Sequence, residues 1–163
     1  MKKTTIEEHI DTKYKDYAYY VLEQRAIPRL RDGLKNVQRR ALFVAKDVAK
    51  TYTKVNTLAG QVLPFHPHGD SSISEAIGLM TQDFAGANNY PMFEGKGAFG
   101  NRLSGVGNGI GAPRYVSVKI GEHAKKLLFV DEDLIEMAPN YDGELQEPKN
   151  FLPIVPICLL NGI

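Results

Sequence analysis

The chain has 163 residues, 43% of them hydrophobic and 24% charged. This composition is typical of one folded domain with a core and argues against a disordered chain. A single cysteine, Cys158, excludes an internal disulfide and a cysteine-rich zinc site, and favours a reducing interior. The net charge is +1, yet residues 25–54 hold nine basic and two acidic residues, whereas residues 122–150 hold three basic and eight acidic. The basic stretch favours a polyanion as partner, although a solvated helix face is the more ordinary explanation of charge alone.

Two helices are predicted in the first third of the chain. The first covers residues 5–25, because Thr5 and Glu8 have capping-box spacing and Pro28 closes it; its apolar stripe is Tyr14, Ala18, Val21 and Leu22. The second follows a turn at Asp32-Gly33 and repeats apolar residues at helical spacing: Val37, Ala41, Val44, Ala45 and Val48. Its basic residues are expected away from that stripe: Arg39, Arg40, Lys46 and Lys50.

A helix-turn-helix arrangement is predicted next. A short helix over residues 58–63 ends at Pro64, and FHPHGDSSISEAIGLMTQ turns at Pro67 and Gly69 into another helix capped by Asp70 or Ser71. Ser72 and Glu75 have capping-box spacing. The buried stripe is expected at Ile73, Ala76, Ile77 and Met80, and the opposite face offers Ser71, Ser74, Glu75 and Gly78. A short polar helix after a basic helix is typical of groove-reading proteins.

From residue 90 onward the chain turns to glycine and short β-favouring pieces, around Phe93, Phe99 and residues 115–120. Helices followed by a small β-hairpin region indicate an α+β fold of the winged-helix type. The tail is rich in proline and is expected to begin an extended element: Pro139, Pro148, Pro153 and Pro156. It stops without a closing element, so we expect a piece of a longer architecture.

Three groups of residues are candidates for a chemical site. Gly95, Gly97 and Gly100 have dinucleotide-motif spacing but lack a following helix, so a tight β-turn region is the better interpretation. His66, His68 and Asp70 could bind a metal, but a proline-kinked turn without further histidine or cysteine favours none. Arg114 beside Tyr115 could favour the phenolate and hold a phosphate, which would suit attack on a phosphodiester. The ordinary alternative for Tyr115 is a strand residue packing its ring.

Several stretches together, in this order, resemble the breakage-reunion subunit of type IIA DNA topoisomerases, the gyrase A and topoisomerase IV A family. They are RAIPRLRDGLKNVQRRAL, FHPHGDSSISEAIGLMTQ, EGKGAFGN, the Arg-Tyr of APRYVSVKI, NYDG and LPIVPICLLNG. The resemblance covers residues 17–163, and the last stretch is most similar to the medium subunit of T-even-type phage topoisomerases. Each motif is modest alone, whereas six in order are highly specific.

The resemblance implies a DNA gate whose nucleophile is Tyr115, which would form a 5′-phosphotyrosyl link with DNA. Arg114 would stabilise charge on the phosphate, and His68 would lie near the scissile phosphate. Val155 matches an apolar wedge that enters between base pairs. The remaining DNA contacts carried over are Arg31, Lys35, Arg39, Arg40, His66, Ser71 and Glu75.

The resemblance also implies partners and cofactors. Magnesium and ATP would belong to a separate ATPase/Toprim subunit, with no metal held by this chain, and a second A-type chain or downstream fragment would complete the gate. The expected division is a helical arm over residues 1–25, a winged-helix cleavage domain over 26–137, and the start of a tower domain over 138–163. Without a signal peptide or a membrane-length apolar run, a cytoplasmic location in a bacterium or phage-infected host is expected.

Two functions remain open from the sequence. The first is an enzyme subunit that cleaves and reseals DNA, which the Arg114-Tyr115 pair and the HPHGD turn favour. The second is a truncated, non-cleaving winged-helix module that binds DNA or the partner subunit. The lack of a C-terminal gate favours this second function, as does Pro113, because proline fixes its own φ and restricts Ala112 just before the tyrosine.

Overall fold

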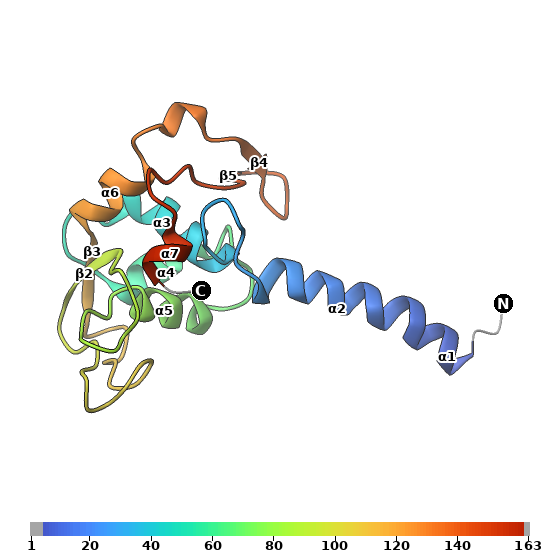
Figure 1. Cartoon of the computed structure of the whole chain (residues 1–163), viewed down its shortest axis with the longest axis horizontal. Coiled ribbons are helices and arrows are strands. Elements are labelled where there is room, and N and C mark those ends of the chain that lie inside the picture. The colour runs from blue at the N-terminus through green and yellow to red at the C-terminus, as the bar shows by residue number, and fades with distance from the viewer. Residues whose placement is uncertain (1–4, 162–163) are drawn as a thin grey trace.

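The computed structural model of the protein describes residues 5–161, which form a rounded body and a helical rod that projects from it (Figure 1). The rod consists of α1 (Ile6–His9), the π-helical η1 (Ile10–Tyr14), α2 (Lys15–Val21) and the π-helical η2 (Leu22–Ala26). It begins with the predicted capping box, in which the Glu8 amide donates to Thr5 Oγ1 at 3.2 Å and the Thr5 amide donates to Glu8 Oε2 at 3.1 Å. It ends two residues before Pro28, as expected.

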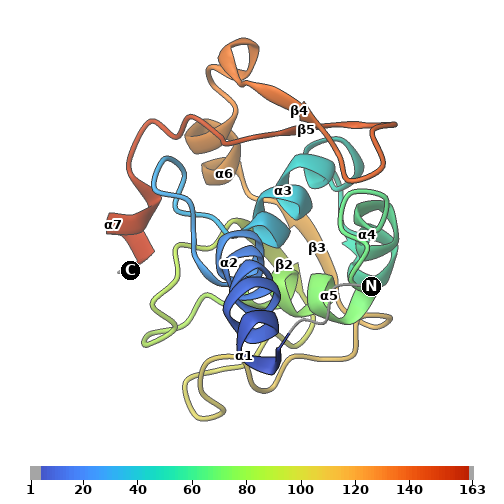
Figure 2. The ribbon, with the colours of Figure 1, turned by 90° about the vertical axis from the view of Figure 1, so that its right-hand side faces the viewer.

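The apolar residues of the rod do not pack into the body. None of its residues is buried, and Tyr14 of the predicted stripe is 65% exposed. The predicted helix is therefore confirmed, and its apolar stripe lies on a rod that projects from the body and is seen end-on in Figure 2. Among the described residues, no helix is both long and apolar enough to cross a membrane.

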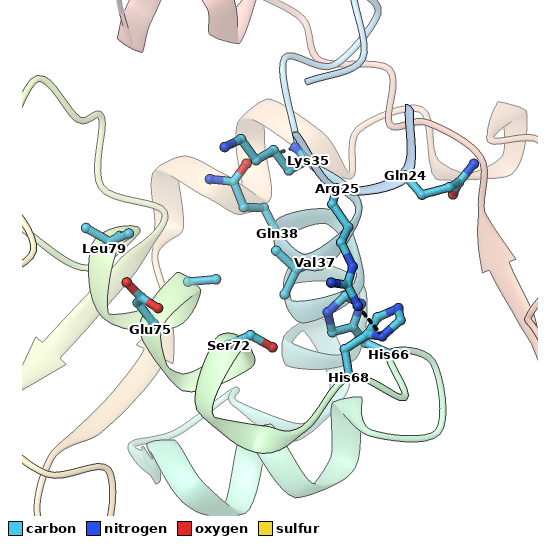
Figure 3. A pocket seen from close by; sticks show the side chains of 11 residues that line it. Gln24, Arg25, Lys35, Val37, Gln38, His66, His68, Ser72, Glu75 and Leu79 are labelled. Carbon is cyan, nitrogen blue, oxygen red and sulfur yellow. Dashed lines mark hydrogen bonds between the residues drawn. The ribbon is translucent and has the colours of Figure 1, made fainter. Parts of the chain in front are cut away.

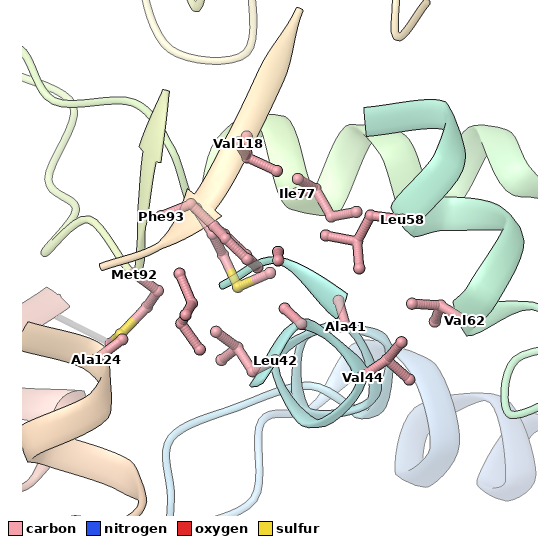
Figure 4. Packing of buried hydrophobic residues seen from close by; sticks show 14 of the residues in the cluster. Ala41, Leu42, Val44, Leu58, Val62, Ile77, Met92, Phe93, Val118 and Ala124 are labelled. Atoms are coloured by element: carbon pink, nitrogen blue, oxygen red, sulfur yellow. The ribbon is translucent and has the colours of Figure 1, made fainter. Parts of the chain in front are cut away.

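Three helices of the body surround one apolar core (Figure 4). They are α3 (Asn36–Val48), α4 (Val55–Val62) and α5 (Asp70–Leu79), and α4 begins three residues earlier than expected. On α3 the residues Ala41, Val44 and Ala45 are buried, with Val37 and Val48 partly buried. On α5 and its C-cap, Met80, every residue of the predicted stripe is buried: Ile73, Ala76, Ile77 and Met80. The two amphipathic patterns thus predicted the core correctly.

The start of α5 differs from the predicted capping box. Its N-cap is Gly69, with a φ of 94° that favours glycine, and Ser72 lies inside the helix, where its hydroxyl donates to the Gly69 carbonyl at 3.1 Å. Ser74 and Gly78 of the expected polar face are buried. A Cβ on Gly78 would lie 3.0 Å from Ile110 Cδ1, so the glycine-rich loop covers this face of α5.

A three-stranded antiparallel sheet, in the order β1-β3-β2, covers the helices. Its strands are β1 (Thr53–Lys54), β2 (Phe93–Lys96) and β3 (Ser117–Ile120), with Thr53 opposite Val118 and Phe93 opposite Ile120. The long loop between β2 and β3 is closed by a bridge between Phe99 and Ile110. The buried Gln82 side chain bonds the Phe99 carbonyl and the Gly107 amide, both at 3.0 Å, which holds the loop against the body.

The last third folds back over the helices instead of remaining extended. It contains α6 (Glu122–Leu128), a 3-10 turn η3 (Glu132–Leu134), β4 (Met137–Pro139), β5 (Gln146–Pro148) and α7 (Ile157–Asn161), with β4 antiparallel to β5. Helix α7 packs on the turn at Gly33, where φ is 64° and an added Cβ would lie 2.9 Å from Cys158 Sγ. Helices with small antiparallel sheets confirm the expected α+β class.

Candidate functional site

Two histidines lie in the turn between α4 and α5, each paired with an arginine. His66 is buried and His68 is exposed, and their rings contact edge to face with centroids 4.8 Å apart. A guanidinium nitrogen of Arg40, on α3, lies 3.0 Å from His66 Nδ1. One of Arg25, in η2, lies 2.6 Å from His68 Nδ1 (Figure 3). The base of the rod and the basic helix therefore meet at the histidine turn.

Burial and the neighbouring arginines lower the pKa of both imidazoles. Burial, followed by the charge of Arg40, lowers the pKa of His66 to about 4, and burial followed by Arg25 lowers the pKa of His68. Arginine has donors only, so each Nδ1 must accept, and a neutral ring then carries its proton on Nε2. At neutral pH His68 is thus a hydrogen-bond donor through Nε2.

Arg25, His66 and His68 line a pocket of about 340 Å³ between the rod, α3 and α5, which we call the histidine pocket (Figure 3). Lys35, Ser72 and Glu75 lie around it with Arg25 and the two histidines, while Ser71 is exposed outside its lining. The positive members suit an anion. Sequence reasoning assigned Arg25 to the arm and not to the site; its pairing with His68, 43 residues away, has no local signal.

Arg39 does not lie on the basic face of α3, contrary to expectation. It is 3% exposed, and its guanidinium binds Asp32 through two hydrogen bonds of 2.6 and 2.9 Å. Asn36 Oδ1 and the Leu34 carbonyl accept its other donors at 2.8 and 2.9 Å. We therefore withdraw Arg39 as a phosphate contact, since freeing it would leave the Asp32 carboxylate buried and unpaired.

Arg40 is also engaged, which changes its expected role. Two of its nitrogens bind the Glu147 carboxylate of β5 at 2.6 and 2.7 Å, and the third contacts His66. Arg40 thus orients His66 and anchors the β4–β5 hairpin to α3. Of the predicted basic contacts, Arg31 and Lys35 have exposed side chains available to a ligand.

Tyr115 stands on a tight turn after the glycine-rich loop. Its amide donates to the Ala112 carbonyl at 2.8 Å, which places Pro113 at the second position of the turn, where its fixed φ is favoured. Pro113 therefore fits the turn without distorting it. The Tyr115 side chain is 70% exposed, and the Arg114 guanidinium lies 5.0 Å from its ring centroid.

The tyrosine turn and the histidine turn lie at opposite ends of α4. The amides of Val55 and Asn56, at the start of α4, donate to the carbonyls of Val116 and Pro113, both at 3.2 Å. The His66 amide donates to the carbonyl of Val62, at the other end of the helix, at 3.1 Å. Eight helical residues span about 12 Å, so one chain does not bring Tyr115 into the histidine pocket.

Val155, the expected wedge, is 42% exposed in the segment between β5 and α7. Its neighbour Ile154 is 59% exposed, and the Ile154 amide donates to the Leu127 carbonyl at 3.1 Å. The apolar pair is thus presented to solvent on an anchored backbone. Val155 lies in a part of the chain separate from the residues that line the histidine pocket.

Comparisons with known proteins all point to one family. The family model that describes the A subunit of DNA gyrase/topoisomerase IV matches residues 25–163. The chain is 38% identical to a DNA gyrase A subunit of Dehalogenimonas lykanthroporepellens and 40% identical to one of Campylobacter jejuni, each over 96% of this chain. It is 38% identical to a DNA topoisomerase 4 A subunit of Neisseria gonorrhoeae over 94% of this chain. It spans 18–20% of the length of these relatives.

Proposed function

Because this chain belongs to the DNA gyrase/topoisomerase IV family of A subunits, we propose that it provides the DNA-binding and DNA-cleaving part of a type II DNA topoisomerase. The relatives carry the names of DNA gyrase and topoisomerase 4 subunits, which supports an isomerase that changes DNA topology. The likeness to the medium subunit of phage enzymes stays a prediction. The single observation that carries the proposal is the exposed Tyr115 on a hydrogen-bonded turn with Arg114 over its ring.

The proposed reaction is a transesterification. Tyr115 Oη loses its proton and attacks a DNA phosphorus, a Tyr–O–P bond forms, and the bond between phosphorus and the 3′ oxygen breaks. The 3′ oxygen leaves as a hydroxyl after taking up a proton, and the 5′ end stays linked to the tyrosine. The reverse attack reseals the strand without further energy input. Arg114 contributes by stabilising negative charge on the phosphate in the transition state.

The histidine pocket offers donors for a phosphodiester. His68 Nε2, the free donors of Arg25 and the Lys35 ammonium lie around one hollow, and a neutral His68 donates without competing for the proton of the nucleophile. We propose that His68 and His66 act near the scissile phosphate, with Ser71, Glu75, Arg31 and Lys35 along the bound DNA. Arg40 acts through His66 and not on phosphate directly.

The length of α4 supports a site shared between two molecules. The tyrosine turn and the histidine pocket lie at its two ends, so the tyrosine of one chain would serve a phosphate held by a second A-type copy or a downstream fragment. This arrangement gives two cleavage sites per pair, as a double-strand break requires. It also places the second copy among the partners we propose, together with double-stranded DNA.

The proposed cofactors belong to the partner. Among residues 5–161, no group of three or more histidine, cysteine, aspartate or glutamate side chains could hold a metal ion. Within this described part of the chain no donor set fits a resident magnesium site, and no step proposed here passes through one. We propose that the ATPase/Toprim subunit brings magnesium and uses ATP, and that the helical arm is a docking element for it.

The architecture supports a winged-helix assignment in finer detail. We propose that helices α4 and α5 are the helix-turn-helix pair and that the β1-β3-β2 sheet with its long loop is the wing; the element order and the strand order support this. We propose an arm over residues 1–25, a cleavage domain over 26–137 and the start of a tower over 138–163. Residues 1–4 and 162–163 of that division lie outside the described residues. Val155 would then be the wedge that bends DNA.

Covalent capture tests the proposed reaction. The chain is mixed with its ATPase/Toprim subunit, end-labelled duplex DNA and magnesium, and quenched with detergent. We expect label covalently attached to this chain, lost in Tyr115→Phe because the phenol oxygen that forms the ester is missing. Tyr141→Phe is the matched control, since Tyr141 is also exposed, at 59%, but lies by the β4–β5 turn.

The control should retain the adduct at the level of the original protein. A full adduct in Tyr115→Phe would exclude Tyr115 as the nucleophile. Salt-sensitive DNA binding with no adduct in any mixture would leave the alternative function, a non-cleaving module that binds DNA or the partner subunit.

A further inference from the structure

Lys54 lies at an unusual place for a lysine. It ends β1 and is the N-cap residue of α4, with a φ of −61° and a ψ of 139° and no side-chain capping bond. Helix N-caps favour serine, threonine, aspartate and asparagine, and a positive charge there opposes the helix dipole. Because lysine is unfavourable as an N-cap, the presence of Lys54 suggests a role other than starting α4.

The Lys54 side chain reaches the tyrosine turn, the turn at residues 112–115. Its ammonium donates to the Tyr115 carbonyl at 2.9 Å. The flanking carbonyls of Pro113 and Val116 accept from the Asn56 and Val55 amides. Three hydrogen bonds thus join the tyrosine turn to the start of α4. Lys54 donates through its side chain, and Val55 and Asn56 donate through their backbone amides.

We propose that Lys54 is a positioning residue for the Tyr115 nucleophile, holding the carbonyl of the tyrosine residue itself against the start of α4. The inference rests on the proposed function. The exposed phenol has no burial to fix it, so its position depends on the backbone beneath it and on Arg114. Small displacements of a reacting group are costly, since a misplacement of about 1 Å can slow a reaction about a hundredfold.

Lys54→Ser separates positioning from folding. Serine is a good N-cap and removes the opposing charge, so the melting temperature should rise by about 2 °C. The serine cannot reach the Tyr115 carbonyl, and we expect single-turnover adduct formation, at saturating DNA with magnesium and the partner subunit, to slow about tenfold. A residue needed only for stability would lower both quantities.

Two further variants complete the test. Lys54→Arg keeps a long cationic donor and should recover most of the adduct rate. Lys50→Ser is the matched control, because Lys50 is an exposed lysine four residues earlier whose ion pair is with Asp47 at 3.6 Å. An adduct rate in Lys54→Ser equal to that of the original chain overturns the proposal, as does a loss confined to DNA affinity and its salt dependence.

Amide hydrogen exchange tests the same contact without cleavage. The Tyr115 amide, which donates to Ala112, should exchange several-fold faster in Lys54→Ser and at the original rate in Lys50→Ser. Unchanged exchange in Lys54→Ser would contradict the inference even if the chain forms an adduct. Conversely, faster exchange in a chain that forms no adduct would leave the contact standing while the proposed reaction fails.

Discussion

His66 shows how much one buried side chain depends on its partners. It is 5% exposed, accepts from Arg40 and contacts the His68 ring edge to face, and burial lowers its pKa to about 4. In the unfolded chain its pKa returns to the ordinary value of 6.5. The unfolded state therefore binds a proton at a higher pH than the folded state does.

We expect the free energy of unfolding to be independent of His66 above about pH 6.5 and to fall as the pH drops toward 4. The pKa difference corresponds to a loss of about 3 kcal/mol at the acid end. Urea unfolding from pH 4 to 7.5 measures it, with His66→Gln removing the titration while keeping an acceptor for Arg40. His123→Gln, at an exposed histidine of α6, should leave the loss intact. Parallel pH profiles for the original chain and His66→Gln would contradict this account.

At the residue scale, the sequence identified side chains better than their surroundings. The resemblance carried over His66 and His68, and the structure brings them together in one pocket with Lys35 and Glu75. It could not reveal that Asp32 neutralises Arg39, because the carboxylate lies in the preceding turn and helical periodicity describes only α3. Nor could it pair Arg25 with His68, since the contact depends on how the rod leaves the body.

Helix α5 depends on the conformation of its N-cap residue, Gly69. Gly69 has a φ of 94° and a ψ of 156°, a region that other residues rarely adopt, and a Cβ there would meet nothing within 4 Å. Gly60 within α4 also has open space around it, but its φ is an ordinary helical one. Substitutions at these two glycines therefore distinguish the effect of backbone strain from the effect of steric contact.

We expect Gly69→Ala to destabilise the chain by about 1–3 kcal/mol, because alanine is strained at that φ. Gly60→Ala should stabilise it by about 0.5–1 kcal/mol, since alanine is the better helix residue. Chemical denaturation of both variants measures the two changes. Equal effects of the same sign would show that the conformation of Gly69 does not determine the start of α5.

At the element scale, long amphipathic helices were predictable and short elements were not. The apolar periods of α3 and α5 depend only on residues within each helix. Strand β1 has two residues and exists because Thr53 and Lys54 pair with β3, more than sixty positions away. The segment of β4 and β5 was expected to be an extended tail, and its hairpin was not predicted. The hairpin contacts α3 through Glu147 and Arg40, which lie 107 positions apart, so no local pattern indicates it.

Across the whole molecule, fewer basic side chains are free to meet a polyanion than the sequence suggests. Of the basic residues on and before α3, Arg39 is buried against Asp32 and Arg40 is paired with Glu147. Arg31 and Lys35 have exposed side chains. The surface available to a polyanion is therefore narrower than the nine basic residues of this stretch indicate.

We expect Arg31→Gln and Lys35→Gln each to weaken DNA binding regardless of sequence and to reduce the slope of log affinity against log salt by about one. Each variant removes one phosphate contact and the counterion release that accompanies it. Titrations from low to moderate salt measure the slope, with Lys126→Gln, an exposed lysine of α6, as control. Slopes that match the original chain would exclude this face as the phosphate track.

The pairing of early and late segments also bears on how the chain is made. Asp32 accepts from the Phe151 amide, 119 residues later, and Arg40 binds Glu147, 107 residues later. At about 5–20 residues per second, a ribosome takes about 5 to 24 seconds to deliver these partners. During that interval the nascent chain carries the carboxylate and guanidinium groups of α3 and its preceding turn without their last contacts. Arg40, which contacts His66, thus gains its pairing with Glu147 only after β5 has been synthesised.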